Sequence, residues 1–149
     1  MKINYKYILV FAWMIVIFLL SNEPAVVSSG RSDLIVYAIT TSFHSNMSQE
    51  IMTFLVRKSA HITAYFILGV LIFNIVKDYK YKSIYAISIS IGMAFLYAVS
   101  DEFHQSFVPG RSCELRDVII DTTASIVGVC LFYLLCKVCR TCINNKKDV

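Results

Sequence analysis

Charged residues are scarce in this sequence: they make up 16% of its 149 positions, and only two residues are proline, whereas hydrophobic residues make up 57%. The mean hydropathy of +0.64 leaves too little polar surface for an ordinary soluble domain. No basic patch interleaved with aromatic residues is present, so the net charge of +4 does not indicate nucleic-acid binding. The composition therefore predicts an integral membrane protein, with membrane lipids as partners and acidic headgroups near its basic residues.

Four apolar blocks divide the chain, and each approaches the ~20 residues that cross a bilayer as a helix. We expect an all-α fold, a single domain over residues 1–149 built as a bundle of four transmembrane helices. The expected spans are about 5–21, 60–76, 83–100 and 118–138. A basic start with a short apolar core also describes a signal peptide, but no A-x-A cleavage site follows, and three further spans favour a retained first helix.

The connection between the first two blocks carries two stretches apolar enough for short helices at the membrane surface, 33–43 and 48–56. We therefore expect an interfacial helical segment between the first and second spans. The second stretch can also run on into the second span.

Basic residues are unevenly divided between the two ends of the expected bundle. Nine lie on the side of the termini and five on the other, so the positive-inside rule places both termini in the cytoplasm. Eight of the ten acidic residues lie on the outer side or just beneath it. We expect the functional chemistry to face outward.

Charge is concentrated between Ser100 and Asp121. Asp101 lies three residues before His104 and four before Gln105, so the three share a face if the third helix continues that far. A carboxylate beside an imidazole is the pairing that general base catalysis requires. The alternative is a water-exposed helix end with solvated charges, and for Glu102 we favour that alternative.

The outer end of the second span contributes Lys58, His61 and Tyr65, which are three and four residues apart and so stack along one side of the helix. A charged His61 within the first turn of the span is costly unless it is paired or reached by water. A neutral histidine that makes one hydrogen bond between helices is the alternative, and both stay open.

The fourth span carries a polar stripe of Asp117, Asp121 and Ser125 at four-residue steps. Asp121 should lie about 6 Å below Asp117 at the helical rise per residue. An acid at that depth is a functional candidate by default. The alternative is a structural role, in which Asp121 bonds a neighbour such as Tyr97 or His61, and Ala124 and Gly128 form a small-residue helix contact.

Pro109 and Gly110 predict a turn between the third and fourth spans, because proline presets one backbone angle and glycine accepts a positive φ at the next position. This turn would hold Arg111 over the outer mouth of the bundle. Its planar guanidinium can grip a phosphate or a carboxylate with two parallel bonds. An internal pair with Asp101, Glu102 or Asp117 is at least as well supported.

Metal ligands are present without a specific spacing. Oxygen and imidazole ligands could come from a set of five residues: Asp101, Glu102, His104, His61 and Asp117. No H-E-x-x-H or comparable motif unites them, so we expect no metal and no cofactor. Cys136, Cys139 and Cys142 drift around a continuous helix with no fourth ligand nearby, which favours packing at the membrane border.

Taken jointly, the motifs resemble the VanZ-like membrane proteins. The resemblance rests on Arg57-Lys58-Ser59-Ala60-His61, Tyr65, Gly69, Asp101-Glu102-Phe103-His104-Gln105, Pro109-Gly110-Arg111-Ser112 and Asp117-Val118, and it reaches from the first span to Gly128. It implies a small multi-pass protein of the bacterial plasma membrane, in a family linked to low-level teicoplanin resistance. Asp121 stands where the family often has asparagine, which adds a charge to the site, and Ala124 where glycine is common.

Three functions compete. The first is an outer-face site, catalytic through Asp101, His104, His61 and Asp117 and binding through Arg111, Lys58, Gln105, Glu102, Tyr65 and Asp121, that modifies or binds an envelope lipid, a lipid-linked peptidoglycan precursor or a glycopeptide. The second is a noncatalytic scaffold whose polar cluster is an interhelical network. The third, a transporter, is weaker, because no inverted repeat or paired half-helices are evident. Whether the chain is an enzyme, and its oligomeric state, stay open.

Overall fold

The computed structural model describes residues 5–43, 48–79 and 81–145, and every regular element within these ranges is an α-helix. The all-α prediction is confirmed. Five helices follow one another along the chain: α1 (Tyr5–Ser21), α2 (Ala25–Phe43), α3 (Gln49–Val76), α4 (Ser83–Gln105) and α5 (Leu115–Asn145).

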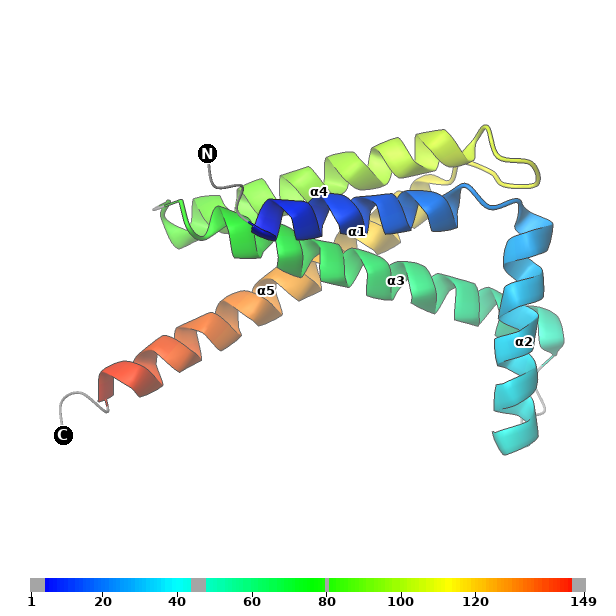
Figure 1. Ribbon diagram of the computed structural model, residues 1–149, viewed down its shortest axis with the longest axis horizontal. Coiled ribbons are helices and arrows are strands. Elements are labelled where there is room, and N and C mark those ends of the chain that lie inside the picture. The colour runs from blue at the N-terminus through cyan, green and yellow to red at the C-terminus, as the bar shows by residue number, and fades with distance from the viewer. Residues whose placement is uncertain (1–4, 44–47, 80, 146–149) are drawn as a thin grey trace.

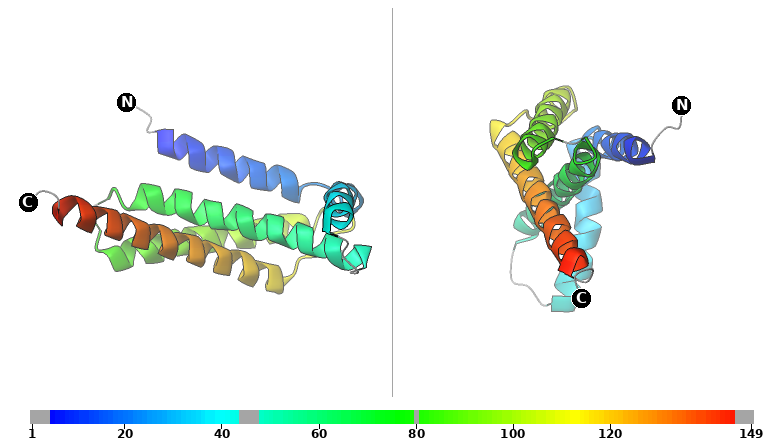
Figure 2. Two further views of the ribbon diagram at one scale, coloured as in Figure 1. Left: turned by 90° about the horizontal axis from the view of Figure 1, so that it is seen from below. Right: turned by 90° about the vertical axis from the view of Figure 1, so that its left-hand side faces the viewer.

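Four of the helices form a bundle, and α2 lies across one of its ends (Figure 1). The left view of Figure 2 shows α1, α3 and α4 running lengthwise, with α2 seen nearly along its own axis. Both termini lie at the opposite end. At that end the side chain of Lys6 on α1 forms an ion pair with Asp78, in the turn between α3 and α4. The end crossed by α2 therefore collects the end of α1, the turn after α4 and the start of α5.

Three helices in the described part of the chain are long and apolar enough to cross a membrane: Gln49–Val76, Ser83–Gln105 and Leu115–Thr141. The shorter apolar helix α1 has 17 residues. At the helical rise this gives about 25 Å, against a hydrocarbon core of about 30 Å. Large apolar side chains such as Phe11, Leu96 and Leu131 are exposed on the outside of the bundle. The chain is thus a multi-pass membrane protein.

The region between the first two spans is helical as expected, with longer elements than the two predicted stretches. The 33–43 stretch is the second half of α2, which begins directly after Pro24, where the helical pattern of hydrogen bonds starts at the Pro24 carbonyl. The 48–56 stretch is the first part of α3. Arg57, Lys58 and Ser59 interrupt the apolar pattern but not the helix, because no glycine or proline precedes Gly69 in α3.

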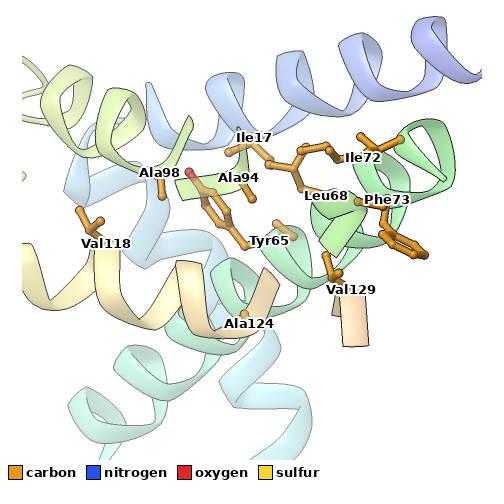
Figure 3. Packing of buried hydrophobic residues seen from close by; sticks show 13 residues of the cluster. Ile17, Tyr65, Leu68, Ile72, Phe73, Ala94, Ala98, Val118, Ala124 and Val129 are labelled. Atoms are coloured by element: carbon orange, nitrogen blue, oxygen red, sulfur yellow. The ribbon is translucent and has the colours of Figure 1, made fainter. Parts of the chain in front are cut away.

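The core forms where α3 and α5 approach most closely. Tyr65, Leu68 and Val129 are fully buried, and Tyr65 lies among side chains from α1, α4 and α5 (Figure 3). A Cβ added to Gly69 would lie 2.6 Å from the backbone oxygen of Ser125, and one added to Gly128 would lie 2.4 Å from that of Phe66. The two glycines permit this contact, as small residues do between membrane helices.

Candidate functional site

Polar side chains from every bundle helix gather at the end crossed by α2. They comprise Ser21 from α1, Lys58, His61 and Tyr65 from α3, Asp101, Glu102 and Gln105 from α4, Asp117 and Asp121 from α5, and Arg111 from the turn between α4 and α5. The structure thereby brings together the sequence-predicted site residues, with the exception of His104.

Asp101 is the hub of this cluster and is only 4% exposed. Its Oδ2 accepts hydrogen bonds from Ser21 Oγ at 2.8 Å, Tyr65 Oη at 3.1 Å and Gln105 Nε2 at 3.2 Å. Its Oδ1 is buried and has no hydrogen-bond partner within the described residues. One oxygen of the carboxylate is therefore fixed by α1, α3 and α4, while the other stays free.

The structure does not bring His104 to Asp101. His104 Nε2 lies 3.1 Å from Asn22 Oδ1, and its ring centroid lies 4.6 Å from that of Phe18. Three positions along a helix of 3.6 residues per turn leave two side chains about 60° apart around the axis. Asp101 and His104 both reach the end of α1, where Asp101 accepts a hydrogen bond from Ser21 and His104 lies beside Asn22, but the two side chains do not bond to each other.

His61 and Asp121 form the cross-helix pair that the sequence suggested. His61 Nδ1 lies 3.7 Å from Asp121 Oδ2, beyond hydrogen-bond length, and Asp121 is 1% exposed. His61, Asp101 and Asp121 each offer one ligand atom, and these atoms lie within 4.8 Å of one another. Glu102, His104 and Asp117 of the larger ligand set considered above are not part of this group.

The other acids of the cluster have partners of their own. Asp117 forms an ion pair with Lys58. Glu102 is 1% exposed, and its Oε2 accepts a hydrogen bond from the backbone N–H of Glu114 at 3.0 Å. The expectation of a solvated Glu102 is therefore wrong, because the segment that leads into α5 folds over the end of α4 and covers it.

Arg111 links the end of α1 to the end of α4 beside the cluster. The preceding turn is as expected, with Gly110 at φ 77° and the Arg111 amide bonded to the Val108 carbonyl. The guanidinium donates to none of the expected acids. It donates instead through Nε to the Glu23 carbonyl at 2.9 Å, through Nη2 to the Leu20 carbonyl at 3.1 Å and through Nη1 to Gln105 Oε1 at 3.1 Å.

Two cavities adjoin the cluster. The first, about 300 Å³, is lined by residues of α1, α2 and α3 together with Arg111: Ile17, Leu20, Ser21, Ser28, Ser32, Ile35, Val56, Arg57, Ala60, His61, Ala64 and Arg111. The second, about 100 Å³, is polar and is lined by Phe54, Arg57, Lys58, His61, Gln105, Gly110, Arg111, Ser112, Glu114 and Asp117. Arg57, His61 and Arg111 line both cavities and so mark their junction.

Charge at this junction is positive. Burial and the neighbouring positive charge of Arg57 lower the pKa of Arg111, although a guanidinium stays protonated at any physiological pH. Two guanidinium groups that face one space repel each other. An anion placed between them would remove that repulsion.

Sequence reasoning missed two residues of this end. Arg57 was not among the candidate site residues. Its place next to Lys58 in the same motif is the signal that could have identified it. Ser21, which is fully buried and donates to Asp101, was predicted only as the last residue of the first span. No local pattern marks a single serine 80 residues away as a partner of Asp101.

Tyr65→Phe is expected to lower the free energy of unfolding by about 2 kcal/mol, because it removes one of three hydrogen bonds to a buried carboxylate. The measurement is an unfolding titration of the purified protein in detergent. Tyr85→Phe is the matched control, since Tyr85 is exposed, and it should change stability by no more than about 0.5 kcal/mol. Equal stability of the two variants would contradict the role given to the Tyr65 hydroxyl.

The chain matches the family model described as VanZ/LLP1 over residues 6–137. The match runs from α1 into α5 and contains every residue of the cluster. No curated protein and no solved structure matches the chain significantly. The match confirms what the motifs around Asp101 and Arg111 indicated, and the chain belongs to the VanZ-like family.

Proposed function

We propose that the end of the bundle crossed by α2 binds an anionic amphiphile of the cell envelope, a lipid or a lipid-linked peptidoglycan precursor, and that this lowers susceptibility to teicoplanin. The observation that carries the proposal is the junction of an apolar cavity with a polar one at Arg57, His61 and Arg111. An amphiphile has the same division, with a charged headgroup joined to an apolar chain.

The headgroup would lie in the polar cavity. Arg111 uses three of its five N–H donors within the protein. Arg57 makes no hydrogen bond to any described residue and lines both cavities. Planar guanidinium groups suit phosphate and carboxylate because they bind two oxygens at once. Lys58, already paired with Asp117, would contribute less than the sequence suggested.

The apolar chain would lie against Ile17, Leu20 and Ile35 in the larger cavity. Its volume of about 300 Å³ is at the small end for ligand sites, so it would hold a segment of an acyl or prenyl chain while the remainder stays in the bilayer.

We further propose four membrane spans with both termini in the cytoplasm. α1 lies antiparallel to α3 along the bundle (Figure 1), and a helix of its length needs only a small local thinning of the bilayer to cross it. The excess of basic residues at the end of the termini supports this orientation. The cavity junction would then face the outer leaflet, where peptidoglycan precursors are used.

Arg57→Gln tests the headgroup site most cleanly, because Arg57 has no bond within the described protein to lose. We expect at least about tenfold weaker retention of anionic lipid, the loss of one charge-assisted contact. The measurement is native mass spectrometry of the purified protein with phosphatidylglycerol in one arm and a polyprenyl diphosphate in the other. The arm with the larger loss identifies the ligand source.

Arg140→Gln is the matched control, since Arg140 lies on the last part of α5, at the opposite end. It should retain lipid like the unchanged protein, and cells that produce it should keep their teicoplanin susceptibility. If Arg57→Gln retains both lipids and leaves teicoplanin susceptibility unchanged while the protein is inserted normally, the proposed function is wrong.

A noncatalytic scaffold is the second candidate, and the bonds to Asp101 Oδ2 favour it, because they tie α1, α3 and α4 together. Under that function Asp101→Asn should destabilise the protein without changing lipid retention. A functional cluster commonly costs stability, so under the binding function the same substitution should leave the protein as stable or more so.

A further inference from the structure

We propose that His61, Asp101 and Asp121 bind one divalent transition-metal ion, with zinc as the best fit, directly beneath the cavity junction. The lipid-binding function proposed above needs no metal, so this inference goes beyond it. The three residues come from three different helices, α3, α4 and α5, which meet at this point.

The three ligand atoms could hold a small ion after moving slightly closer together. The three candidate ligand atoms lie within 4.8 Å of one another, and His61 Nδ1 lies 3.7 Å from Asp121 Oδ2. Metal–ligand distances of about 2.1 Å with tetrahedral angles place ligand atoms about 3.4 Å apart. The atoms would therefore move inward by roughly 1 Å or less on binding.

Two buried oxygens lack partners at this place. Asp121 Oδ2 and Asp101 Oδ1 are both buried and accept no hydrogen bond from any described residue, and the residues are 1% and 4% exposed. Buried carboxylate oxygens without partners are rare, because removing them from water is costly. A cation between them would satisfy both oxygens at once.

Neighbouring cations are already engaged elsewhere. Lys58 pairs with Asp117, and Arg111 donates to the Leu20 and Glu23 carbonyls and to the Gln105 amide. Within the described residues, His61 is the only basic side chain at ion-pair distance from Asp121 or Asp101, and it cannot neutralise two carboxylates. A bound divalent ion would supply the missing positive charge.

The surroundings of Asp101 are those of a positioned ligand. Ser21, Tyr65 and Gln105 all donate to Oδ2, and this fixes the carboxylate with Oδ1 free to coordinate. Outer-shell hydrogen bonds of this kind orient metal ligands in characterised sites. Arg111 donates a hydrogen bond to Gln105, so the turn at Pro109 and Gly110 supports the site without contacting the ion.

The donor set selects among ions. One imidazole and two carboxylates are ligands that zinc accepts, and three protein ligands leave its fourth position open. Calcium needs six to eight oxygens, and magnesium prefers an octahedron of oxygens. Because His61 lines both cavities, the open position would accept water or a phosphate oxygen of a bound headgroup.

The test uses the full chain in detergent, stripped with a chelator and titrated with zinc chloride by calorimetry, with metal content measured independently. We expect one zinc per chain, with magnesium and calcium failing to compete at equal concentration. Asp121→Asn and His61→Gln should each weaken zinc binding at least about 100-fold, since even outer-shell changes cost 10–100-fold. Asp78→Asn, a carboxylate at the opposite end of the bundle, is the control and should keep full affinity.

An X-ray absorption spectrum of the zinc-loaded protein makes the test independent of whether the variants fold. Nitrogen and oxygen ligands near 2.0–2.2 Å support the site, whereas sulfur ligands near 2.3 Å would assign the ion to cysteines and overturn it. Absence of zinc binding by the unchanged protein overturns it as well. Lipid retention by Arg57 is measured separately, so either proposal can fail alone.

Discussion

Gly128→Ala is expected to lower the free energy of unfolding by about 2–3 kcal/mol, because the contact between α3 and α5 has no room for a side chain. The added Cβ would lie 2.4 Å from the backbone oxygen of Phe66, and a backbone atom within a helix cannot turn aside as the end of a flexible side chain can. The two helices must separate instead. The measurement is an unfolding titration in mixed detergent micelles.

Gly92→Ala is the matched control for this prediction. A Cβ at Gly92 meets no atom within 4 Å, and alanine is the better helix former by about 0.5–1 kcal/mol. The same substitution should therefore stabilise the protein at position 92 and destabilise it at position 128. Effects of the same sign at both positions would show that the close contact of α3 and α5 does not limit stability.

Ala60→Phe is expected to abolish retention of the amphiphile and to return teicoplanin susceptibility to that of cells without the protein. Ala60 lines the apolar cavity, and a benzyl group there would fill much of its roughly 300 Å³. The substitution leaves every charge of the headgroup site in place. Ala60→Phe therefore tests whether the apolar chain of the ligand is excluded. Arg57→Gln tests the electrostatic contribution to binding.

Ala12→Phe is the control, because Ala12 is exposed on α1 and lines neither cavity. Both variants should insert into membranes in equal amounts, which immunoblotting of membrane fractions checks. If Ala60→Phe still copurifies with as much lipid as Ala12→Phe, the apolar cavity is not where the ligand lies.

Much of the fold followed from the sequence, because a bilayer imposes length and polarity on each spanning helix. The apolar blocks located α1 and the three helices that are long enough to cross a membrane, and Pro109-Gly110 located a turn whose glycine does have a positive φ. The start of α3 was left open between two alternatives, since Arg57 and Lys58 break the apolar pattern while the backbone stays helical. Hydrophobic periodicity reports what a helix faces, and it does not report where the helix begins.

The sequence predicted which residues belong to the candidate site better than it predicted which of them contact each other. His61 and Asp121 could be matched because their helices bring them to the same end of the bundle. Asp101 was matched with His104 by spacing, yet Asp101 bonds Tyr65 and Ser21 while His104 lies beside Asn22. The partners of Arg111 include two backbone carbonyls. Every residue has a carbonyl, so no residue type in the sequence could single out Leu20 or Glu23.

Those two carbonyls have a consequence for how the protein is made. Leu20 and Glu23 leave the ribosome 91 and 88 residues before Arg111, whose side chain caps them. Until Arg111 is synthesised, the Leu20 and Glu23 carbonyls at the end of the first helix depend on water for these hydrogen bonds. The contact that completes the end of the first helix thus forms only after Arg111 is synthesised, and nascent chains that stop before Arg111 should keep α1 more accessible to protease than longer ones.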